Sequence, residues 1–335
     1  MDETPLLDLQ LRAAGKPGLF SLLCAAEGVL VGGKFRIQCP LAAGRQSFVF
    51  LASDENGNRV VVKQPAFDYL RPAQHTIASV ARARQMLYRE FAVLTSAASS
   101  FLPQPYGFFV QDPIIPAAME CNALESDEIY LALEFIEGES IHQLALGAWR
   151  NEPPAARERR LLQLAQDFAR FWQDLHAAGW HYCDVSPSNL LVERATGRLR
   201  VLDAGSVVAA SESITLAVVT PAYCTPNVYE AYRSGRQVPG TLASALPLLG
   251  KIMHFAMTLD EPLNGRLPDL KSPELAKYSA GAQRTIAAFL SLDQDPTRLE
   301  KARAALETWL NDANASIASS LSSDVQGERL AFGSS

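Results

Sequence analysis

Cysteine is scarce in this sequence, and the cysteines it has follow no pattern. There are five, which is an odd number, and none of them forms a C-x-x-C pair with another. Disulfide frameworks and zinc sites both need cysteines in pairs or at short spacings. The sequence therefore argues against both kinds of site and indicates reduced thiols, which are typical of a cytoplasmic protein.

Long apolar runs and an excess of positive charge are also missing. No uncharged apolar run is long enough to span a bilayer, and the stretch 19–31, interrupted by Glu27, is expected to be a buried element. The chain begins with the acidic Asp2 and Glu3 rather than with the basic region of a signal peptide. The formal net charge of −6 argues against an extended nucleic-acid surface. We therefore expect neither a membrane span nor a nucleic-acid partner.

The composition of the chain is that of a globular protein. Its 335 residues are 48% hydrophobic and 20% charged, and this length suits one large domain or two lobes around a cleft. The two ends differ from the middle. Residues 1–34 form an extension without an interpretable motif, whereas residues 311–335 are rich in Ser, Ala and Gly and are predicted to be disordered.

One stretch, 181–192, combines acidic, amide and apolar residues in an informative order. Pro187 prevents a helix, because its ring removes a backbone donor and restricts the residue before it. Asp184 and Asn189 are thus placed on a loop, and Asp203 follows at the end of the next apolar run. Two carboxylates and an amide can hold Mg²⁺ and orient a hydroxyl beside a phosphate. From these residues alone, an ordinary hairpin with solvated acids remains an alternative.

A lysine and a glutamate upstream are predicted to form an ion pair. The strands 48–51 and 60–62 are joined across an Asn-Gly hairpin signal, and the second strand ends in Lys63. A lysine that closes a buried strand needs a counter-ion, unless its stem reaches solvent at a sheet edge. The helical pattern over 73–98 places Glu90 on an apolar stripe, where a carboxylate is unusual unless it is paired. We therefore predict a contact between Glu90 and Lys63.

These motifs resemble those of protein kinases and occur in the same order. Tyr182-Cys183-Asp184 and Asn189 stand where the family has H-R-D-L-x-x-x-N, and Asp203-Ala204-Gly205 stands where it has D-F-G. Lys63 and Glu90 match the family's Lys–Glu pair. The chain is identified as a divergent member of the Hanks-type protein kinase superfamily, without the Arg that usually precedes the catalytic Asp.

The resemblance implies an α+β, two-lobed protein-kinase-like fold. Residues 35–136 would form the small β-rich lobe with one long helix, and residues 137–310 the large, mainly helical lobe. The implied activity is an ATP- and Mg²⁺-dependent phosphotransferase, most simply a Ser/Thr protein kinase with a divergent Gly-rich loop.

The resemblance also implies a role for each matched residue. Lys63, braced by Glu90, holds the ATP phosphates, while Asn189 and Asp203 hold the metal ions. Asp184 orients the acceptor hydroxyl and takes its proton. Most of the catalysis is then positioning and charge neutralisation.

The expected adenine and phosphate contacts lie in the small lobe. Of the glycines in the family's Gly-rich loop, only Gly44 is present in the segment 41–47. The apolar run over 129–138 resembles the last strand and hinge of the small lobe. Leu133 then occupies the gatekeeper position, and the backbone of Glu134 and Ile136 faces adenine.

The region after Asp203 resembles an activation segment and substrate loop. Residues 206–220 are polar, and 220–227 is similar to the family's T-P-x-Y-x-x-P-E, with Asn227 in place of Glu. In the family that Glu pairs with a distant Arg, which Arg298 matches. Thr220 matches the threonine that contacts the catalytic Asp in Ser/Thr kinases, so the expected substrate is a protein with a Ser or Thr acceptor.

The same sequence also fits two alternatives. The first is a pseudokinase, a nucleotide-binding scaffold that serves a regulatory protein partner. The second is a small-molecule kinase similar to aminoglycoside or choline kinases, against which the 220–227 segment argues. The pseudokinase alternative rests on the eroded Gly-rich loop and on the following departures from the family pattern: Cys183, Ser186, Ala204, Asn227 and Ala245.

Overall fold

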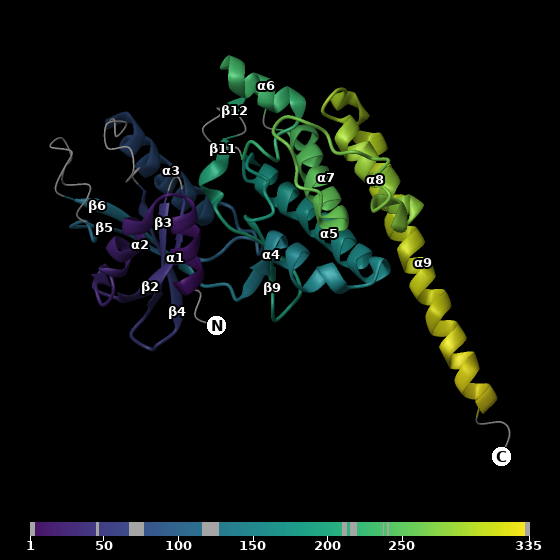
Figure 1. Cartoon of the computed structure of the whole chain (residues 1–335), viewed down its shortest axis with the longest axis horizontal. Helices are drawn as coiled ribbons and strands as arrows, with labels where there is room; N and C mark the ends of the chain where they lie inside the picture. Colours follow the sequence, from purple (N-terminus) through teal and green to yellow (C-terminus); the bar gives the residue numbers. More distant parts are fainter. Residues whose placement is uncertain are drawn as a thin grey trace. The chain divides into compact units, whose positions relative to one another are not determined.

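The computed structural model describes residues 4–44, 47–66, 77–115, 127–209, 213–214, 220–236, 238–239 and 241–331. The chain divides into two compact units. The first consists of Met1–Glu137 and Arg200–Val207, and the second of Gly138–Leu199 and Val208–Ser335. Figure 1 labels helices and strands of both units.

The first unit is built on an antiparallel sheet of six strands in the order β1-β2-β3-β4-β6-β5. The predicted hairpin between β3 and β4 is confirmed, and Gly57 in its turn has a positive φ of 80° that favours glycine. The β-branched run that precedes Lys63 suits a half-buried strand. The strands are β1 (Leu30–Val31), β2 (Phe35–Ala43), β3 (Ser47–Ser53), β4 (Arg59–Pro65), β5 (Pro105–Gln111) and β6 (Glu128–Glu134).

Strand register decides which side chains of β4 reach each face of the sheet. Val62 pairs with Phe50 and with Ala132, and all three are fully buried in one core. Lys63 is the next residue, so its side chain points to the opposite face. A slip of one residue would exchange the two faces. Because Val62 must stay in the buried core, Lys63 must point to the other face.

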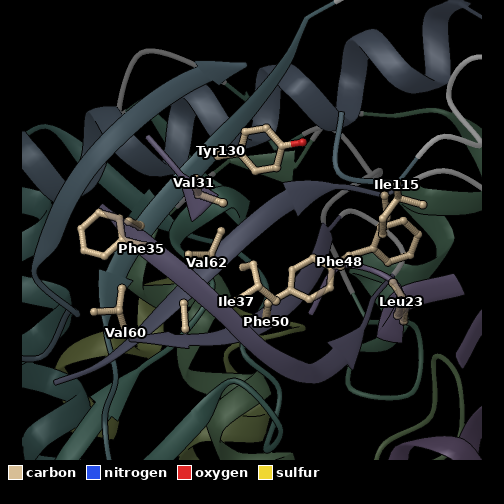
Figure 2. Close-up of a cluster of buried hydrophobic side chains, with 14 of the residues drawn as sticks. Leu23, Val31, Phe35, Ile37, Phe48, Phe50, Val60, Val62, Ile115 and Tyr130 are labelled. Carbon is tan, nitrogen blue, oxygen red and sulfur yellow. The ribbon is translucent and has the colours of Figure 1, made fainter. Parts of the chain in front are cut away.

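The N-terminal extension is part of the first unit. It forms helices α1 (Thr4–Ala13) and α2 (Pro17–Cys24), which pack against β2. Their leucines, among them the fully buried Leu23, join one core cluster with Phe48 and Phe50 of β3 (Figure 2). The prediction that the stretch 19–31 is buried holds only in part, because Leu19, Leu23, Ala26 and Val31 are buried whereas Leu30 is exposed.

A long helix packs against the sheet. Helix α3 (Ile77–Ser96) contacts β4, β5 and β6 and carries Glu90. Its predicted start at residue 73 lies outside the described residues. Its end at Ser96 agrees with the predicted end at residue 98 to within the usual uncertainty of helix termini.

The second unit is mainly helical. Its centre is α7, whose residues are buried along nearly its whole length, the mark of a helix surrounded by other elements. Helices α5 and α8 pack against it, and α9 packs against α8. The helices are α4 (Ile141–Leu146), α5 (Pro154–Ala177), α6 (Pro226–Ser234), α7 (Leu242–Thr258), α8 (Ala280–Ser291) and α9 (Leu299–Ala331). This unit also has the short strands β7 (Gly138–Ser140), β8 (Trp180–Tyr182), β9 (Leu190–Glu193), β12 (Ser213–Ile214) and β13 (Val238–Pro239). The strands β10 (Leu199–Val201) and β11 (Val207–Ala209) each contain residues of both units.

The predicted disorder of residues 311–335 is not what the structure shows for most of this segment. Helix α9 continues through Ala331 instead of ending at residue 310. The segment 311–331 has no proline and is rich in alanine, whose helix propensity is the highest of all residues. The prediction of disorder relied on the polar composition of this segment and was therefore wrong. Among the described residues, none of the helices has both the length and the apolar character required to cross a membrane.

The packing of α2 on the sheet generates a stability prediction. Leu23→Ala should lower the free energy of unfolding by about 2–4 kcal/mol, because it removes buried methyl groups and leaves a cavity. Leu9→Ala on α1 is the matched control, because Leu9 is 63% exposed. Urea denaturation measures the free energy of unfolding of both variants. Equal, small effects of the two substitutions would show that the extension does not belong to the core.

Candidate active site

The predicted ion pair between Lys63 and Glu90 is confirmed. The Lys63 Nζ lies 2.7 Å from Oε1 of Glu90, and both residues are buried. Lys63 comes from β4 and Glu90 from α3, so the contact joins the sheet to the helix that packs on it. A buried ammonium and a buried carboxylate each require such a partner, because burial of an isolated charge is very costly.

A third charge acts on this pair. Burial lowers the pKa of Lys63, but the carboxylates of Glu90 and Asp203 outweigh it, and the net shift of the Lys63 pKa is upward. Burial raises the pKa of Glu90, Asp203 adds to that shift, and Lys63 opposes it. Lys63 is thus paired with Glu90, and the Asp203 carboxylate also favours its charged form. A cluster with these charges suits a ligand that brings anionic groups and a cation together.

Asp203 has an unusual backbone conformation. Its φ of 62° and ψ of 69° lie in the left-handed region, and its Oδ1 accepts a hydrogen bond from the Gly205 amide at 3.3 Å. A Cβ on Gly205 would lie 3.2 Å from Asp203 Oδ1 and 3.3 Å from the Met86 carbonyl oxygen of α3, so a larger residue here would fit tightly. A non-glycine residue in this region costs about 1–2 kcal/mol, and such residues cluster at functional sites.

Asp184 and Asn189 lie on the loop between β8 and β9 of the second unit. The Asn189 side-chain nitrogen donates to the Asp184 backbone carbonyl at 3.2 Å and to Asp184 Oδ2 at 3.4 Å. The loop is held in place by the buried Val185 and Leu190 and by Pro187, whose carbonyl accepts from the His142 amide. The side-chain nitrogen of Asn189 is used by Asp184, and the side-chain oxygen is the atom of Asn189 that can serve as a cation ligand.

The predicted contact between Thr220 and Asp184 is also confirmed. Oδ1 of Asp184 accepts two hydrogen bonds from Thr220, one from the backbone amide at 2.7 Å and one from Oγ1 at 2.8 Å. Two short bonds from one residue fix the orientation of the carboxylate. The substrate-loop motif and the catalytic-loop motif, which are far apart in the sequence, therefore meet within the second unit.

The candidate adenine contacts lie at the end of β6. Leu133 is buried, and the amide of Glu134 donates to the Gln104 carbonyl at 2.8 Å. The Glu134 carboxylate accepts from Arg200 at 2.6 Å, a pair that we did not predict. Ile136 is buried in the short connection between β6 and β7, where the chain passes from the first unit to the second.

The segment around Gly44 is shorter than expected. Strand β2 extends to Ala43 and β3 begins at Ser47, so most of the loop predicted over 41–47 is strand. The Gly44 amide donates to the Ser47 carbonyl at 2.9 Å. This amide is therefore used inside the turn, while residues 45–46 lie outside the described residues.

Arg298 forms no salt bridge with position 227, as expected from the replacement of Glu by Asn227. Arg298 pairs with Asp295 at 2.9 Å, and the side-chain amide of Asn227 donates to the backbone carbonyl of Asp293. Without a carboxylate at position 227, Arg298 has no charge to meet there and instead binds its neighbour. Residues 220–227 have a further anchor that sequence reasoning missed, Lys251 of α7, although a lysine inside an apolar helical run is a visible signal.

The candidate residues form two clusters. Lys63, Glu90 and Asp203 belong to the first compact unit, whereas Asp184 and Asn189 belong to the second. Among the described residues, no group of three or more His, Cys, Asp or Glu side chains is arranged to hold a metal ion by itself. A cation at either cluster would thus need further ligands, for which the oxygen atoms of a phosphate are suited.

Comparison with known protein families shows to which family this chain belongs. Residues 35–240, more than half of the chain, match the family model of the protein kinase domain. The chain belongs to the protein kinase family. Its β-rich first unit and mainly helical second unit agree with the predicted α+β kinase fold.

Curated kinases are similar to this chain at low identity. The serine/threonine-protein kinase AfsK of Streptomyces griseus is 28% identical over 240 residues, which are 70% of this chain and 26% of that protein. The serine/threonine-protein kinase pkn3 of Myxococcus xanthus is 25% identical over 181 residues, which are 53% of this chain and 28% of that protein. The chain thus spans roughly a quarter of the length of these kinases.

The Lys63–Glu90 pair generates a testable prediction. Lys63→Met and Glu90→Gln should each lower the free energy of unfolding by about 3–5 kcal/mol, because each leaves a buried charge without its partner. The double variant should lose much less than the sum, since the pair acts as one unit. Arg12→Met, in the exposed Arg12–Asp8 pair, is the control and should cost at most about 1 kcal/mol. Fully additive losses in urea denaturation would contradict the prediction.

Proposed function

We propose that this protein is an active protein kinase that transfers the terminal phosphate of ATP to serine or threonine side chains. The observation that carries the proposal is the double hydrogen bond from Thr220 to Asp184 Oδ1, at 2.7 and 2.8 Å. These bonds hold the carboxylate in one orientation. A group that receives a proton from a hydroxyl must be held in this way. The names of the similar curated proteins support serine and threonine as acceptors.

The residues of the two clusters fit Mg²⁺ and ATP. The Asp203 carboxylate and the Asn189 amide oxygen are the oxygen ligands that Mg²⁺ prefers, and the Lys63 ammonium suits the phosphates. We assign the backbone of Glu134 and Ile136, the side chain of Leu133 and the turn at Gly44 to the nucleotide as well. When bound, Mg·ATP supplies the phosphoryl group, and its metal neutralises charge on the phosphates.

The protein's own contribution is orientation and charge. Asp184 orients the acceptor hydroxyl and takes its proton, and Thr220 keeps the carboxylate directed toward that task. Glu90 holds the Lys63 ammonium in place, so this charge needs no reorganisation during transfer. Asp203 and Asn189 would each offer an oxygen ligand to the cation.

A pseudokinase is the second candidate. The turn at Gly44, whose amide is already bonded to Ser47, favours it, because fewer backbone donors then remain for phosphates. In that case the protein binds a nucleotide and a regulatory partner but transfers nothing. The 220–227 segment, which is ordered on Asp184, continues to argue against a small-molecule kinase.

The deciding experiment compares the wild type with Asp203→Asn in a transfer assay with labelled ATP and Mg²⁺. We expect Asp203→Asn to lose about a hundredfold or more of the activity toward generic protein substrates, since it removes a carboxylate that would hold the metal ion. Asp312→Asn is the control, because Asp312 is exposed on α9. Wild-type rates in Asp203→Asn would place the site elsewhere.

The same assay separates the candidates. Phosphoserine and phosphothreonine in the products agree with the proposal, and phosphotyrosine alone contradicts it. Binding of Mg·ATP by the wild type without any transfer would identify a pseudokinase.

Activity should not depend on phosphorylation of the activation segment. Regulated kinases use the Arg before the catalytic Asp to pair with a phosphate on this segment, whereas Cys183 is a buried thiol whose Sγ faces the His181 carbonyl at 3.6 Å. Arg200, which could have replaced that Arg, pairs with Glu134.

The test replaces the three hydroxyl residues of the activation segment by Ala and treats the wild type with phosphatase. These residues are Ser211, Ser213 and Thr215, of which the first and last lie outside the described residues. Both preparations should keep wild-type activity. A loss above about tenfold, roughly 1.4 kcal/mol of transition-state stabilisation, would show that a phosphate switch exists.

A further inference from the structure

Lys251 of α7 is a buried lysine whose hydrogen bonds are all made to backbone carbonyls. It is 2% exposed, and its Nζ donates to Ala222 at 2.8 Å, Cys224 at 2.7 Å and Leu263 at 3.3 Å. An ammonium group has three N–H donors, and here three acceptors receive them. Such complete pairing is what makes a buried charge tolerable.

Two of these carbonyls belong to the turn that carries Thr220. The amides of Tyr223 and Cys224 donate to the Thr220 carbonyl at 3.0 and 3.2 Å, so residues 220–224 form a compact turn. Thr220 gives both of its donors to Asp184. A continuous series of hydrogen bonds therefore leads from Lys251 through the turn to the Asp184 carboxylate, all within the second unit.

The charges around Lys251 show why a lysine suits this position. Burial lowers the pKa of Lys251 to about 8, while Cys224 and Asp293 oppose that shift. Asp293 also accepts from the Asn227 amide at 3.4 Å. In the family pattern an ion pair fixes the end of this segment, but Asn227 has no charge. The Lys251 ammonium supplies a positive charge at the carbonyls of the same segment.

We propose that Lys251 is a positioning residue for phosphoryl transfer, which fixes the turn 220–224 so that Thr220 orients Asp184. This inference rests on the proposed function. It assigns Lys251 no contact with the nucleotide or the acceptor. Its effect on transfer is exerted entirely through Thr220, and it leaves the Lys63–Glu90 cluster of the first unit unchanged.

The first test measures the turn itself and needs no activity. In Lys251→Met, hydrogen exchange of peptides that cover 220–227 should become faster, and Cys224, which is buried in the wild type, should be alkylated more readily. Lys251→Arg should retain most of the protection. Lys271→Met, an exposed lysine of the same unit, is the control. Unchanged exchange and alkylation in Lys251→Met would overturn the proposal, whether or not the protein is a kinase.

The second test measures transfer. Lys251→Met should lower kcat by about a hundredfold, the size of effect that a misplacement of about 1 Å produces, while the KM for ATP and the binding of Mg·ATP stay at wild-type values. A purely structural role predicts instead that kcat per nucleotide-binding molecule is unchanged, and that result would overturn the proposal.

A double-mutant cycle with Thr220→Val identifies the route of the effect. If Lys251 acts through Thr220, the double variant loses little more activity than either single variant, whereas additive losses would contradict it. If Lys251→Met does not fold, Lys251→Gln replaces it, because Gln keeps two N–H donors without the charge. The same faster exchange and lower kcat are then expected. Absence of transfer by the wild type would refute the proposed function and leave the exchange result to decide the role of Lys251 in the turn.

Discussion

The buried ion pair between Lys63 and Glu90 is the constraint on which the first unit depends. Each of its charges would be very costly to bury alone, so β4 and α3 must pack in the one register that brings Nζ and Oε1 to 2.7 Å. The same register places Val62 in the core on the opposite face of the sheet. Asp203, in its left-handed conformation, adds a second carboxylate and gives the cluster a net negative charge that a bound cation can compensate.

In the second unit the corresponding constraint is the orientation of the Asp184 carboxylate. This unit must hold Asp184 in one orientation. Two positions of the family pattern near this loop, Cys183 and Asn227, differ from the usual Arg and Glu. Thr220 bonds both of its donors to Asp184, Lys251 binds the carbonyls of the turn that follows, and Asn227 binds Asp293. Divergence at Cys183 and Asn227 thus accompanies a different set of hydrogen bonds around the same loop.

The N-terminal helices show how an unremarkable segment gains a structural role. Helices α1 and α2 contribute leucines to the core that Phe48 and Phe50 form on one face of the sheet (Figure 2). A sheet with an uncovered apolar face is prone to association. Helices α1 and α2 cover part of that face and so contribute to the stability of the sheet that carries Lys63.

The sequence by itself determined the order and type of the main elements and marked Lys63, Glu90, Asp184, Asn189 and Asp203 as candidate site residues. Each of these residues stands in a local pattern: a β-branched run, an amphipathic helix, a proline-interrupted loop or the end of a strand. Only the tertiary structure revealed Lys251, the partner of Asn227 and the packing of α2. Lys251 is bound by backbone carbonyls of residues distant in the chain, and every residue has a carbonyl, so no side-chain pattern marks the acceptors. Long-range packing alone decides which of them meet.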